Sequence, residues 1–308
     1  MKIAMMGSGG VGGFFGGRLA HAGCDVSFIA RGAHLAAMRK RGLTIENEPQ
    51  GNIRVAKVRV TDDPAQLGRV DLVIVSVKLW DTESAARQIK PLLGPGTGVL
   101  SLQNGVIKDD ILRRELGDAA VMGGVGYVAT HISRPGVIHQ TGTMQRVVLG
   151  EYDGRKSERA TFLHEALVRA GINAELSEDV RRAIWEKYVF LVALSGTTTT
   201  MRMPIGPIRG NPQTRAFLRE LIREAVAVGR AHGVALPEDY AENRLAFADR
   251  LPADMTSSMH HDLERGNPLE VNWLSGGVVQ LGAAKGIPTP ANRAVCDILA
   301  LHAGGKKT

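Results

Sequence analysis

A glycine-rich run near the amino terminus constrains the fold more than any other feature of the chain. Residues 7–12 read Gly-Ser-Gly-Gly-Val-Gly, and 7 of the 37 glycines lie between positions 7 and 17. The apolar run Ile3–Met6 precedes this turn, a helical pattern follows it, and the next β-like run begins at Asp25. A strand, a glycine turn and a helix in this order are typical of the phosphate-binding corner of a dinucleotide-binding βαβ unit. A glycine turn without any ligand is the alternative.

The residues of this turn have separate physical roles. Gly7 permits the tight turn, Gly9 lets the backbone approach a pyrophosphate, and Gly12 lets the helix pack closely on the sheet. Amide groups at the helix N-terminus and the helix dipole favour a bound anion. The cofactor-binding residues expected here are Gly7, Ser8, Gly9, Gly10, Val11 and Gly12.

The end of the second expected strand indicates which dinucleotide binds. An NAD site normally carries Asp or Glu about twenty residues after the turn, where it bonds the ribose 2′-hydroxyl. This chain has Arg31 there. A guanidinium matches a 2′-phosphate, so NADP (NADPH) is the expected cofactor. Arg31 as an ordinary solvated cation is the alternative, and Lys40 and Arg41 are expected to add to the positive field.

Hydrophobic patterns divide the chain near Ser177. Before it, short β-branched runs alternate with helical patterns, which favours a parallel sheet, with antiparallel strands from 44–60 and 121–150 at its edge. After it, Ser177-Glu178-Asp179 is expected to cap a long helix, followed by helices near 213–232, 237–250, 257–264, 269–285 and 290–301. The expected fold is an α/β Rossmann-type domain over residues 1–176 and an all-α domain over residues 177–308. A cleft between them is the expected place for chemistry.

Composition narrows the class of ligand. The 38 Lys and Arg exceed the 31 Asp and Glu, giving a formal charge of +7, but they are scattered and no nucleic-acid-binding motif is present. A small anionic ligand is therefore expected rather than nucleic acid. No run of apolar residues is long enough to span a membrane. A cytoplasmic protein is expected, and a homodimer is left open.

Cysteine and histidine usage gives no sign of a metal. Cys24 and Cys296 lie near opposite ends of the chain without a CxxC pattern, so neither a disulfide framework nor a zinc site is expected. His260, His261 and Asp262 are sequence neighbours that point in different directions on a helix. They are interpreted as surface residues, and no metal is expected.

Several short motifs resemble the ketopantoate reductase (2-dehydropantoate 2-reductase) family. They run in order across both domains: the glycine turn, Arg31, Ser76-Val77-Lys78, Leu102-Gln103-Asn104-Gly105-Val106, Trp185-Glu186-Lys187, Ser257-Ser258-Met259 and Glu270. The resemblance implies a Rossmann domain followed by a helical domain like the C-terminal domain of 6-phosphogluconate dehydrogenase. It also implies NADPH-dependent reduction of a 2-oxo acid, such as 2-dehydropantoate to pantoate in pantothenate biosynthesis.

The resemblance assigns roles to individual residues. Lys187 would donate a proton to the substrate's C2 oxygen, and its apolar helix is expected to bury it and lower its pKa. Glu270 would pair with Lys187 or bond the cofactor. Lys78 and Asn104 follow consecutive strands and would contact the cofactor, Asn104 also the substrate. Ser258 would bond the substrate carboxylate. The alternatives are a snorkelling side chain for Lys187, ordinary loop polarity for Lys78 and Asn104, and a helix-capping or surface role for Glu270 and Ser258.

The chain departs from the family where the family's asparagines hold substrate. Those four positions are here Leu191, Ser195, Ile205 and Met255. Ser195 remains a candidate substrate ligand, and Thr197–Thr200 could supply replacement hydroxyls. Because a pocket built on amide hydrogen bonds changes when they are lost, a bulkier or more apolar 2-oxo acid is the hypothesis. An NADP-binding sensor without turnover and a 3-hydroxy acid dehydrogenase are the competing functions.

Overall fold

The computed structural model describes residues 1–47 and 51–306, so most of the turn expected at Glu48-Pro49-Gln50-Gly51 lies outside the described residues. The chain forms two compact units. Unit 1 contains Met1–Gln103 and Lys108–Ala183, and unit 2 contains Asn104–Ile107 and Ile184–Thr308. The division therefore falls inside helix α6 (Val180–Met201), and a short loop of the first half of the chain belongs to unit 2.

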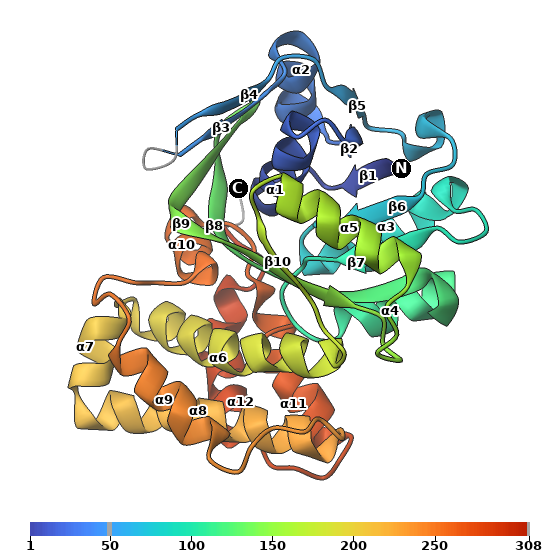
Figure 1. Cartoon of the computed structure of the whole chain (residues 1–308). Coiled ribbons are helices and arrows are strands. Elements are labelled where there is room, and N and C mark those ends of the chain that lie inside the picture. Colours follow the sequence, from blue (N-terminus) through green and yellow to red (C-terminus); the bar gives the residue numbers. More distant parts are fainter. Residues whose placement is uncertain (48–50, 307–308) are drawn as a thin grey trace. The chain divides into compact units, whose positions relative to one another are not determined.

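Unit 1 is built on a parallel sheet of doubly wound type (Figure 1). Six strands lie in the order β5-β2-β1-β6-β7-β8 with every neighbouring pair parallel. Ligands of such sheets bind at the carboxyl ends of the strands where the strand order reverses, which here is between β1 and β6. These strands are β1 (Lys2–Met6), β2 (Asp25–Ile29), β5 (Arg59–Thr61), β6 (Leu72–Val75), β7 (Gly98–Ser101) and β8 (Val121–Arg134).

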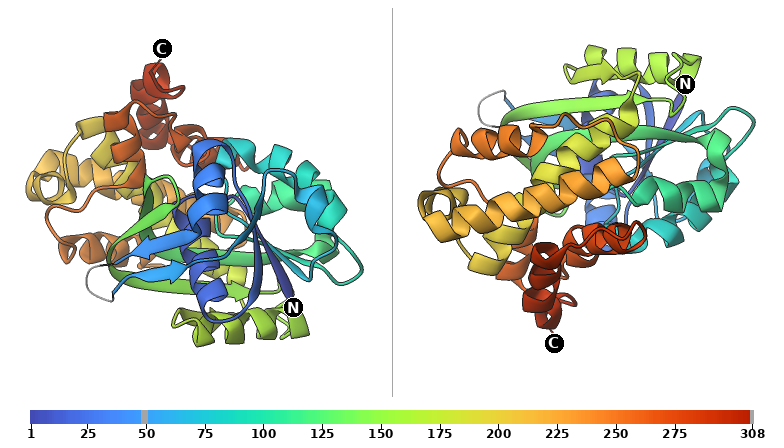
Figure 2. Two further views of the ribbon diagram at one scale, coloured as in Figure 1. Left: turned by 90° about the horizontal axis from the view of Figure 1, so that it is seen from above. Right: turned by 90° about the horizontal axis from the view of Figure 1, so that it is seen from below.

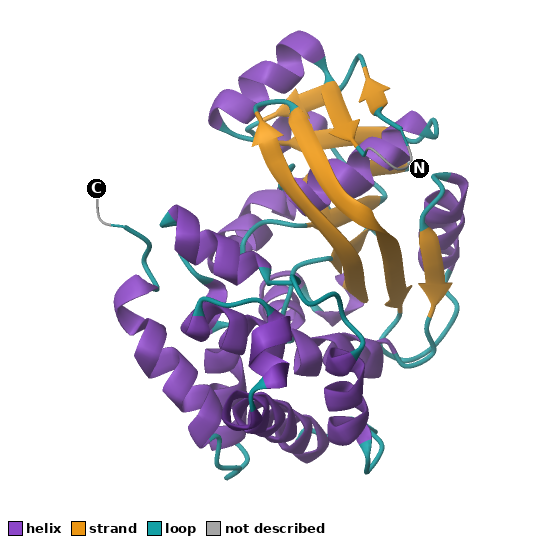
Figure 3. Cartoon of the chain, turned by 90° about the vertical axis from the view of Figure 1, so that its left-hand side faces the viewer, coloured by secondary structure: helices purple, strands orange, loops and turns teal. Residues whose placement is uncertain are grey.

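The sheet continues beyond β8 with strands of both directions. The expected hairpin over 121–150 is confirmed, because β8 and β9 (Val137–Gly150) are long antiparallel neighbours (Figure 3). β3 (Leu43–Glu46) and β4 (Ile53–Val55) pair antiparallel as expected, and β3 and β10 (Asn173–Leu176) flank β9 in parallel. The expectation for 44–60 is wrong at its end, because β5 joins β2 in the parallel core instead of the antiparallel edge.

Helices cover both faces of the sheet because successive strand residues point to opposite sides. In β1, Ile3 and Met5 pack with α1 and α5, whereas Ala4 and Met6 pack with α3 and α4. Figure 2 shows α5 on one side of the strands and α3 and α4 on the other. The helices of this unit are α1 (Gly10–His21), α2 (Gly32–Arg41), α3 (Thr82–Ile89), α4 (Lys108–Leu116) and α5 (Glu158–Arg169), with the 3₁₀ turns η1 (Pro64–Leu67), η2 (Leu79–Asp81), η3 (Lys90–Leu92) and η4 (Asp118–Ala120).

All the regular secondary structure of unit 2 that the structure describes is helical (Figure 3). Asp179 caps α6, since its carboxylate accepts a hydrogen bond from the Arg182 amide at 3.0 Å while Ser177 bonds the Asp179 amide. The core of the unit forms from apolar residues of α6, α8 and the later helices. After α6 come α7 (Ile205–Gly210), α8 (Pro212–Ala231), α9 (Tyr240–Asp249), α10 (Ser258–Arg265), η5 (Glu270–Asn272), α11 (Ser275–Ala283), α12 (Pro290–Leu299) and η6 (Ala300–His302).

Two expectations for unit 2 need correction. The helix α7 was not expected from the sequence, and the single helix expected over 269–285 is broken into η5 and α11. The break lies at Leu274, whose backbone leaves the helical region with φ −84° and ψ −94°. None of the described helices is long and apolar enough to cross a membrane.

Candidate active site

The glycine turn after β1 has no room for side chains at Gly7, Gly10 and Gly12, and a Cβ at Gly10 would lie 2.5 Å from the Thr130 carbonyl oxygen. A Cβ at Gly12 would lie 2.0 Å from the Gly7 carbonyl oxygen, and one at Gly7 would lie 2.8 Å from Val77. Gly7 also has φ +94°, which side-chain-bearing residues rarely adopt. Gly9 differs, because nothing lies within 4 Å of the place a Cβ would take. The turn is therefore closed toward the protein and open at Gly9.

The open position lies at the N-terminus of α1. Gly9 is the N-cap residue and offers no side-chain cap, and the first turn carries no acidic residue. Amide groups of this turn are thus available to an anion, which is the environment that a dinucleotide pyrophosphate needs. The hydroxyl of Ser8 is already used, since it donates to the Ile29 carbonyl at 2.9 Å, and Ser76 donates to the Gly7 carbonyl at 2.7 Å. Both serines hold the turn in place.

Arg31 stands at the carboxyl end of β2 as the N-cap residue of α2. It is exposed, and its guanidinium has no ion pair or hydrogen bond among residues 1–47 and 51–306. Lys40 and Arg41 occupy the opposite end of α2, about 14 Å away at the usual helical rise. Whether they add to the positive field at Arg31 stays a prediction. Lys78 follows β6, with its ammonium 5.7 Å from the centre of the Trp80 ring.

Lys187 lies on α6 and donates a hydrogen bond from Nζ to Asn104 Oδ1 at 2.8 Å. Two candidate residues separated by 83 positions in the sequence are thereby brought together within unit 2. Lys187 is half-buried rather than buried, as is Asn104. An amide oxygen at this distance orients the ammonium without neutralising its charge.

Tyr188, the next residue of α6, positions the segment that carries Glu270. Its hydroxyl donates to the Leu274 carbonyl at 2.7 Å, and Glu270 is buried at the start of η5. Burial raises the pKa of Tyr188 far above its ordinary value, so the hydroxyl stays protonated as a donor. Gly277 makes room for it, because a Cβ there would lie 2.6 Å from the Tyr188 oxygen. Sequence reasoning did not single out Tyr188, because a tyrosine in an apolar helix is typical of a core residue.

Ser258 is exposed at the first position of α10, and its neighbours tie this helix to α6. Ser257 caps the helix by accepting from the His260 amide at 3.1 Å, and its oxygen lies 3.0 Å from the Thr198 hydroxyl. The His260 ring bonds the Thr198 carbonyl through Nδ1 at 2.7 Å. His260 is only 6% exposed, so its interpretation as a surface residue is wrong, while His261 is exposed. The described residues contain no cluster of three metal-ligating side chains.

The loop that carries Asn104 is held at both ends by buried polar groups. At one end, the Gln103 amide donates to the Val77 carbonyl at 3.0 Å and to Thr82 at 2.8 Å. At the other end, Lys108 is 1% exposed and donates to the carbonyls of Ser101 and Gly124 at 3.0 and 3.1 Å. A charged side chain this deeply buried is rare and costly, so it marks a structural role.

The charge of Lys108 is compensated by its neighbour in the sequence. Asp109 lies 3.0 Å from the ammonium and also accepts a 2.6 Å hydrogen bond from the Tyr152 hydroxyl. Burial lowers the pKa of Lys108, and the Asp109 carboxylate opposes this shift. Arg113 stacks on Tyr152 at 3.6 Å from the ring centre. Sequence reasoning missed this cluster, because Lys108 and Asp109 read as the polar first turn of an ordinary helix.

Comparison with known proteins agrees with this architecture. The chain matches the family described as ketopantoate reductase PanE/ApbA over residues 3–154, and its C-terminal domain over residues 179–303. It is 34% identical to a 2-dehydropantoate 2-reductase of Mesorhizobium japonicum, with 97% of each chain covered. The chain belongs to the ketopantoate reductase family.

Solved structures of family members show the same fold. The structure of a PanE/ApbA family ketopantoate reductase from Ralstonia eutropha is 37% identical with a TM-score of 0.89, and 98% of each chain is covered. A 2-dehydropantoate 2-reductase from Geobacter metallireducens is 29% identical with a TM-score of 0.90, covering 98% of this chain and 99% of that one. Membership makes the protein an NADP-dependent oxidoreductase that acts on CH–OH groups.

The structure shows the surroundings of the four positions at which the family's asparagines are replaced in this chain. Ser195 is 1% exposed, and its hydroxyl has no partner among the described residues. Ile205 is fully buried in the core of unit 2, and its amide donates to the Met255 carbonyl at 2.9 Å, so these two positions are neighbours. Leu191 packs against the same core. Apolar side chains at three of the four positions are therefore part of the helical packing.

The threonine run of α6 does not replace the missing amides. Thr197, Thr198 and Thr200 donate to the carbonyls four residues earlier at 2.7 to 2.8 Å, as hydroxyls inside helices commonly do. Thr199 is the exception, since its buried hydroxyl has no partner among the residues described. The hypothesis that the whole run supplies substrate hydroxyls is thus wrong for the three hydroxyls already bonded.

Proposed function

We propose that the protein reduces a 2-oxo acid to the 2-hydroxy acid with NADPH, using Lys187 as the proton donor. The observation that carries the proposal is the 2.8 Å hydrogen bond from the Lys187 ammonium to Asn104, which holds a proton donor in a fixed direction. Family membership supports the reaction class, and relatives named 2-dehydropantoate 2-reductase make that compound the first substrate to test.

The residues of unit 1 suit the cofactor. Amides of residues 7–12 would hold the pyrophosphate, with the open side of Gly9 toward it, and Arg31 would hold the 2′-phosphate. Lys78, Asn104 and Glu270 are the further cofactor contacts that we propose. When bound, NADPH supplies the hydride that reduces the substrate's C2 carbon.

Lys187 would complete the reduction. Reduction of the C2 carbonyl places negative charge on its oxygen, and the ammonium would give that oxygen a proton, leaving a neutral amine that solvent reprotonates. Asn104 would keep the ammonium directed at the oxygen through its 2.8 Å bond. The exposed Ser258 and the unpartnered hydroxyl of Ser195 would bond the substrate carboxylate. Each of these groups is a hydrogen-bond donor, as a carboxylate requires.

The substrate side chain is proposed to be more apolar or bulkier than that of ketopantoate. A pocket that binds hydroxyl groups needs polar partners, and loss of such partners weakens discrimination in favour of hydroxylated substrates by large factors. Leu191, Ile205 and Met255 offer none through their side chains. Only Ser195 keeps a polar group at these positions.

A panel of 2-oxo acids tests the proposal. We expect NADPH oxidation with an apolar 2-oxo acid at a higher kcat/KM than with ketopantoate, and none with 3-oxo acids. Best turnover of ketopantoate, at micromolar KM, would reject the altered substrate but keep the reaction. No turnover of any 2-oxo acid, with intact NADPH binding, would reject the reaction and favour the sensor.

The cofactor assignment has its own experiment. NADPH and NADH are titrated against wild type and Arg31→Ala, following quenching of protein fluorescence. We expect a preference for NADPH that falls at least tenfold in the variant, because one charge-assisted contact to the 2′-phosphate is lost. Equal affinities for the two nucleotides in both proteins would remove the basis for assigning Arg31 to NADP.

A further inference from the structure

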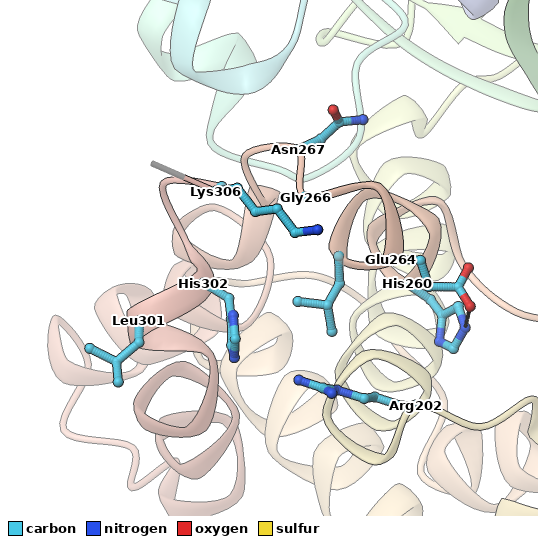
Figure 4. Close-up of a pocket in the computed structure, with 10 residues that line it drawn as sticks. Arg202, His260, Glu264, Gly266, Asn267, Leu301, His302 and Lys306 are labelled. Carbon is cyan, nitrogen blue, oxygen red and sulfur yellow. Dashed lines mark ion pairs between the residues drawn. The ribbon is translucent and has the colours of Figure 1, made fainter. Parts of the chain in front are cut away.

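A pocket of about 400 Å³ in unit 2 contains none of the residues assigned to cofactor or substrate. It lies among the end of α6, the last turns of α10, the loop after α10 and the C-terminal segment from η6 onward (Figure 4). Its volume falls within the range of small-molecule sites, which is about 300 to 1,000 Å³. We call it the basic pocket, because three of its side chains are Arg202, His302 and Lys306.

The three basic side chains come from two segments, Arg202 from the end of α6 and His302 and Lys306 from the C-terminal segment, and they project into the same space. Figure 4 shows the Arg202 guanidinium and the His302 ring on one side and the Lys306 ammonium on another. Within residues 1–47 and 51–306, none of the three side chains has an ion pair or hydrogen bond. Arg202 and Lys306 carry positive charge, which favours an anion between them, and the His302 ring can add a hydrogen bond.

The carboxylate that lines the basic pocket is already engaged. Glu264 lies 3.3 Å from His260 Nε2 and 3.2 Å from His261 Nδ1. In Figure 4 it stands beside His260, away from Lys306 and His302. The positive side of the pocket is therefore left without a counter-charge from this residue.

Arg202 is held in an unusual backbone conformation. Its φ is 51°, and among the described residues no other side-chain-bearing residue has a positive φ. The position follows the last residue of α6, where glycine normally takes the left-handed conformation without cost. Arg202 therefore takes the left-handed conformation of a helix end at a cost that glycine would not carry.

The lysine side of the pocket is also built rather than loose. The Lys306 amide donates to the Gly266 carbonyl at 2.9 Å, and the Leu269 amide donates to the Ala303 carbonyl at 2.9 Å, so the C-terminal segment is docked on the loop after α10. Gly266 has φ +70°, and a Cβ there would lie 2.6 Å from the Lys306 stem. The absence of a side chain at Gly266 makes room for the lysine.

We propose that the basic pocket binds a small phosphate-bearing anion, either free phosphate or a phosphomonoester. A guanidinium presents paired donors that match phosphate oxygens, while an ammonium and an imidazole add donors from other directions. Asn267 lies at the rim, and its side-chain amide donates to the Asp262 carboxylate at 3.1 Å. The site is independent of the proposed reaction, since it shares no residue with the assigned cofactor and substrate ligands.

The test measures binding of inorganic phosphate and of glycerol 3-phosphate by calorimetry, with NADP saturating so that the cofactor's own phosphate contacts are occupied. Ionic strength is matched with sodium chloride. Wild type should bind at least one of the two anions saturably, at submillimolar concentration. Tighter binding of the monoester assigns the pocket to a phosphorylated metabolite, and tighter binding of phosphate assigns it to the free ion. Saturable binding of neither overturns the proposal.

Arg202→Gly separates binding from folding. Glycine suits the left-handed position, so the melting temperature without phosphate should be unchanged or higher, while anion affinity falls at least tenfold. Lys306→Ala should also weaken binding several-fold without altering the melting temperature. Arg250→Gln removes one exposed charge at the end of α9 and should bind like wild type. Equal affinity in wild type, Arg202→Gly and Lys306→Ala would reject the pocket as the binding site.

Discussion

The glycine turn before α1 and the lysine-bearing face of α6 solve their binding problems in different ways. The turn acts through backbone groups, and its glycines are required because Gly7 and Gly12 have no space for a Cβ. The α6 face acts through side chains, so substitutions such as Leu191 change its chemistry while the helix remains intact. Backbone-based sites therefore keep a recognisable motif, whereas side-chain-based sites can change their ligand by single substitutions.

Lys187→Ala removes the proposed proton donor from the α6 face and should have the largest effect. Loss of the proton donor is expected to lower kcat about 100- to 10,000-fold on the best 2-oxo acid, with NADPH affinity unchanged. Steady-state kinetics and fluorescence titration measure the two quantities. Lys285→Ala, an exposed lysine of the same unit, is the control and should behave as wild type. A kcat within tenfold of wild type would mean that another group donates the proton.

Lys108→Met tests whether the buried Lys108 side chain holds the loop that carries Asn104. Removing the ammonium leaves Asp109 charged and buried, which should lower the free energy of unfolding by about 3 to 5 kcal/mol. Denaturant titration measures this loss, and Lys108→Met combined with Asp109→Asn should recover part of it. If the loop positions Asn104, the double variant will still show a reduced kcat, and NADPH affinity will fall as well, because Asn104 is a proposed contact of the cofactor. A fully restored kcat would limit Lys108 to stability.

A comparison of Gly12→Ala with Gly9→Ala tests whether the glycine turn before α1 binds the cofactor through its backbone. A methyl group at Gly12 meets the Gly7 carbonyl, and we expect a loss of about 3 kcal/mol in stability without cofactor. Gly9→Ala has free space and should melt within a degree or two of wild type, yet bind NADPH at least tenfold more weakly. Thermal melts of the free proteins and NADPH titration give both readings. Unchanged NADPH affinity in Gly9→Ala would show that the cofactor does not approach this side of the turn.

Glu151→Gln should have the smallest effect and lies outside both sites. Burial alone would raise the pKa of Glu151, but hydrogen bonds from Arg159 at 2.7 and 2.8 Å and from Ser157 at 2.6 Å outweigh it and lower the pKa. The folded protein therefore binds this proton less readily than the unfolded chain. The stabilisation is present above the unfolded pKa of about 4.3 and is lost as the pH falls through the folded value.

The variant should therefore be less stable than wild type at pH 7, by about 1.5 kcal/mol, and lose less stability on acidification below about pH 4.5. Urea titrations between pH 3 and 7 measure both slopes. Glu165→Gln, an exposed carboxylate on α5, is the control and should change stability by less than about 0.5 kcal/mol. Parallel pH profiles of Glu151→Gln and wild type would contradict the assigned role.

The sequence predictions were accurate where the structure depends on local patterns. The βαβ pattern, the β8–β9 hairpin and the helical second half follow local periodicity, and the structure confirms them. The pairing of β5 with β2 was missed because the partner of a short strand is set by residues far from it in the sequence. His260 was misplaced for a related reason, since its burial depends on Thr198, which lies 62 residues away.

The sequence determined the cofactor class, because the glycine turn at a strand end and Arg31 belong to a chain whose sequence matches the ketopantoate reductase family. It also identified Lys187, Asn104 and Glu270 as candidates through resemblance to a family. Only the tertiary structure decided that Lys187 and Asn104 are hydrogen-bonded, that Lys108 is buried at the end of the Asn104 loop, and that three basic side chains share one pocket. Local patterns encode helices, strands and turns, whereas contacts between side chains far apart in sequence exist only after the chain has packed.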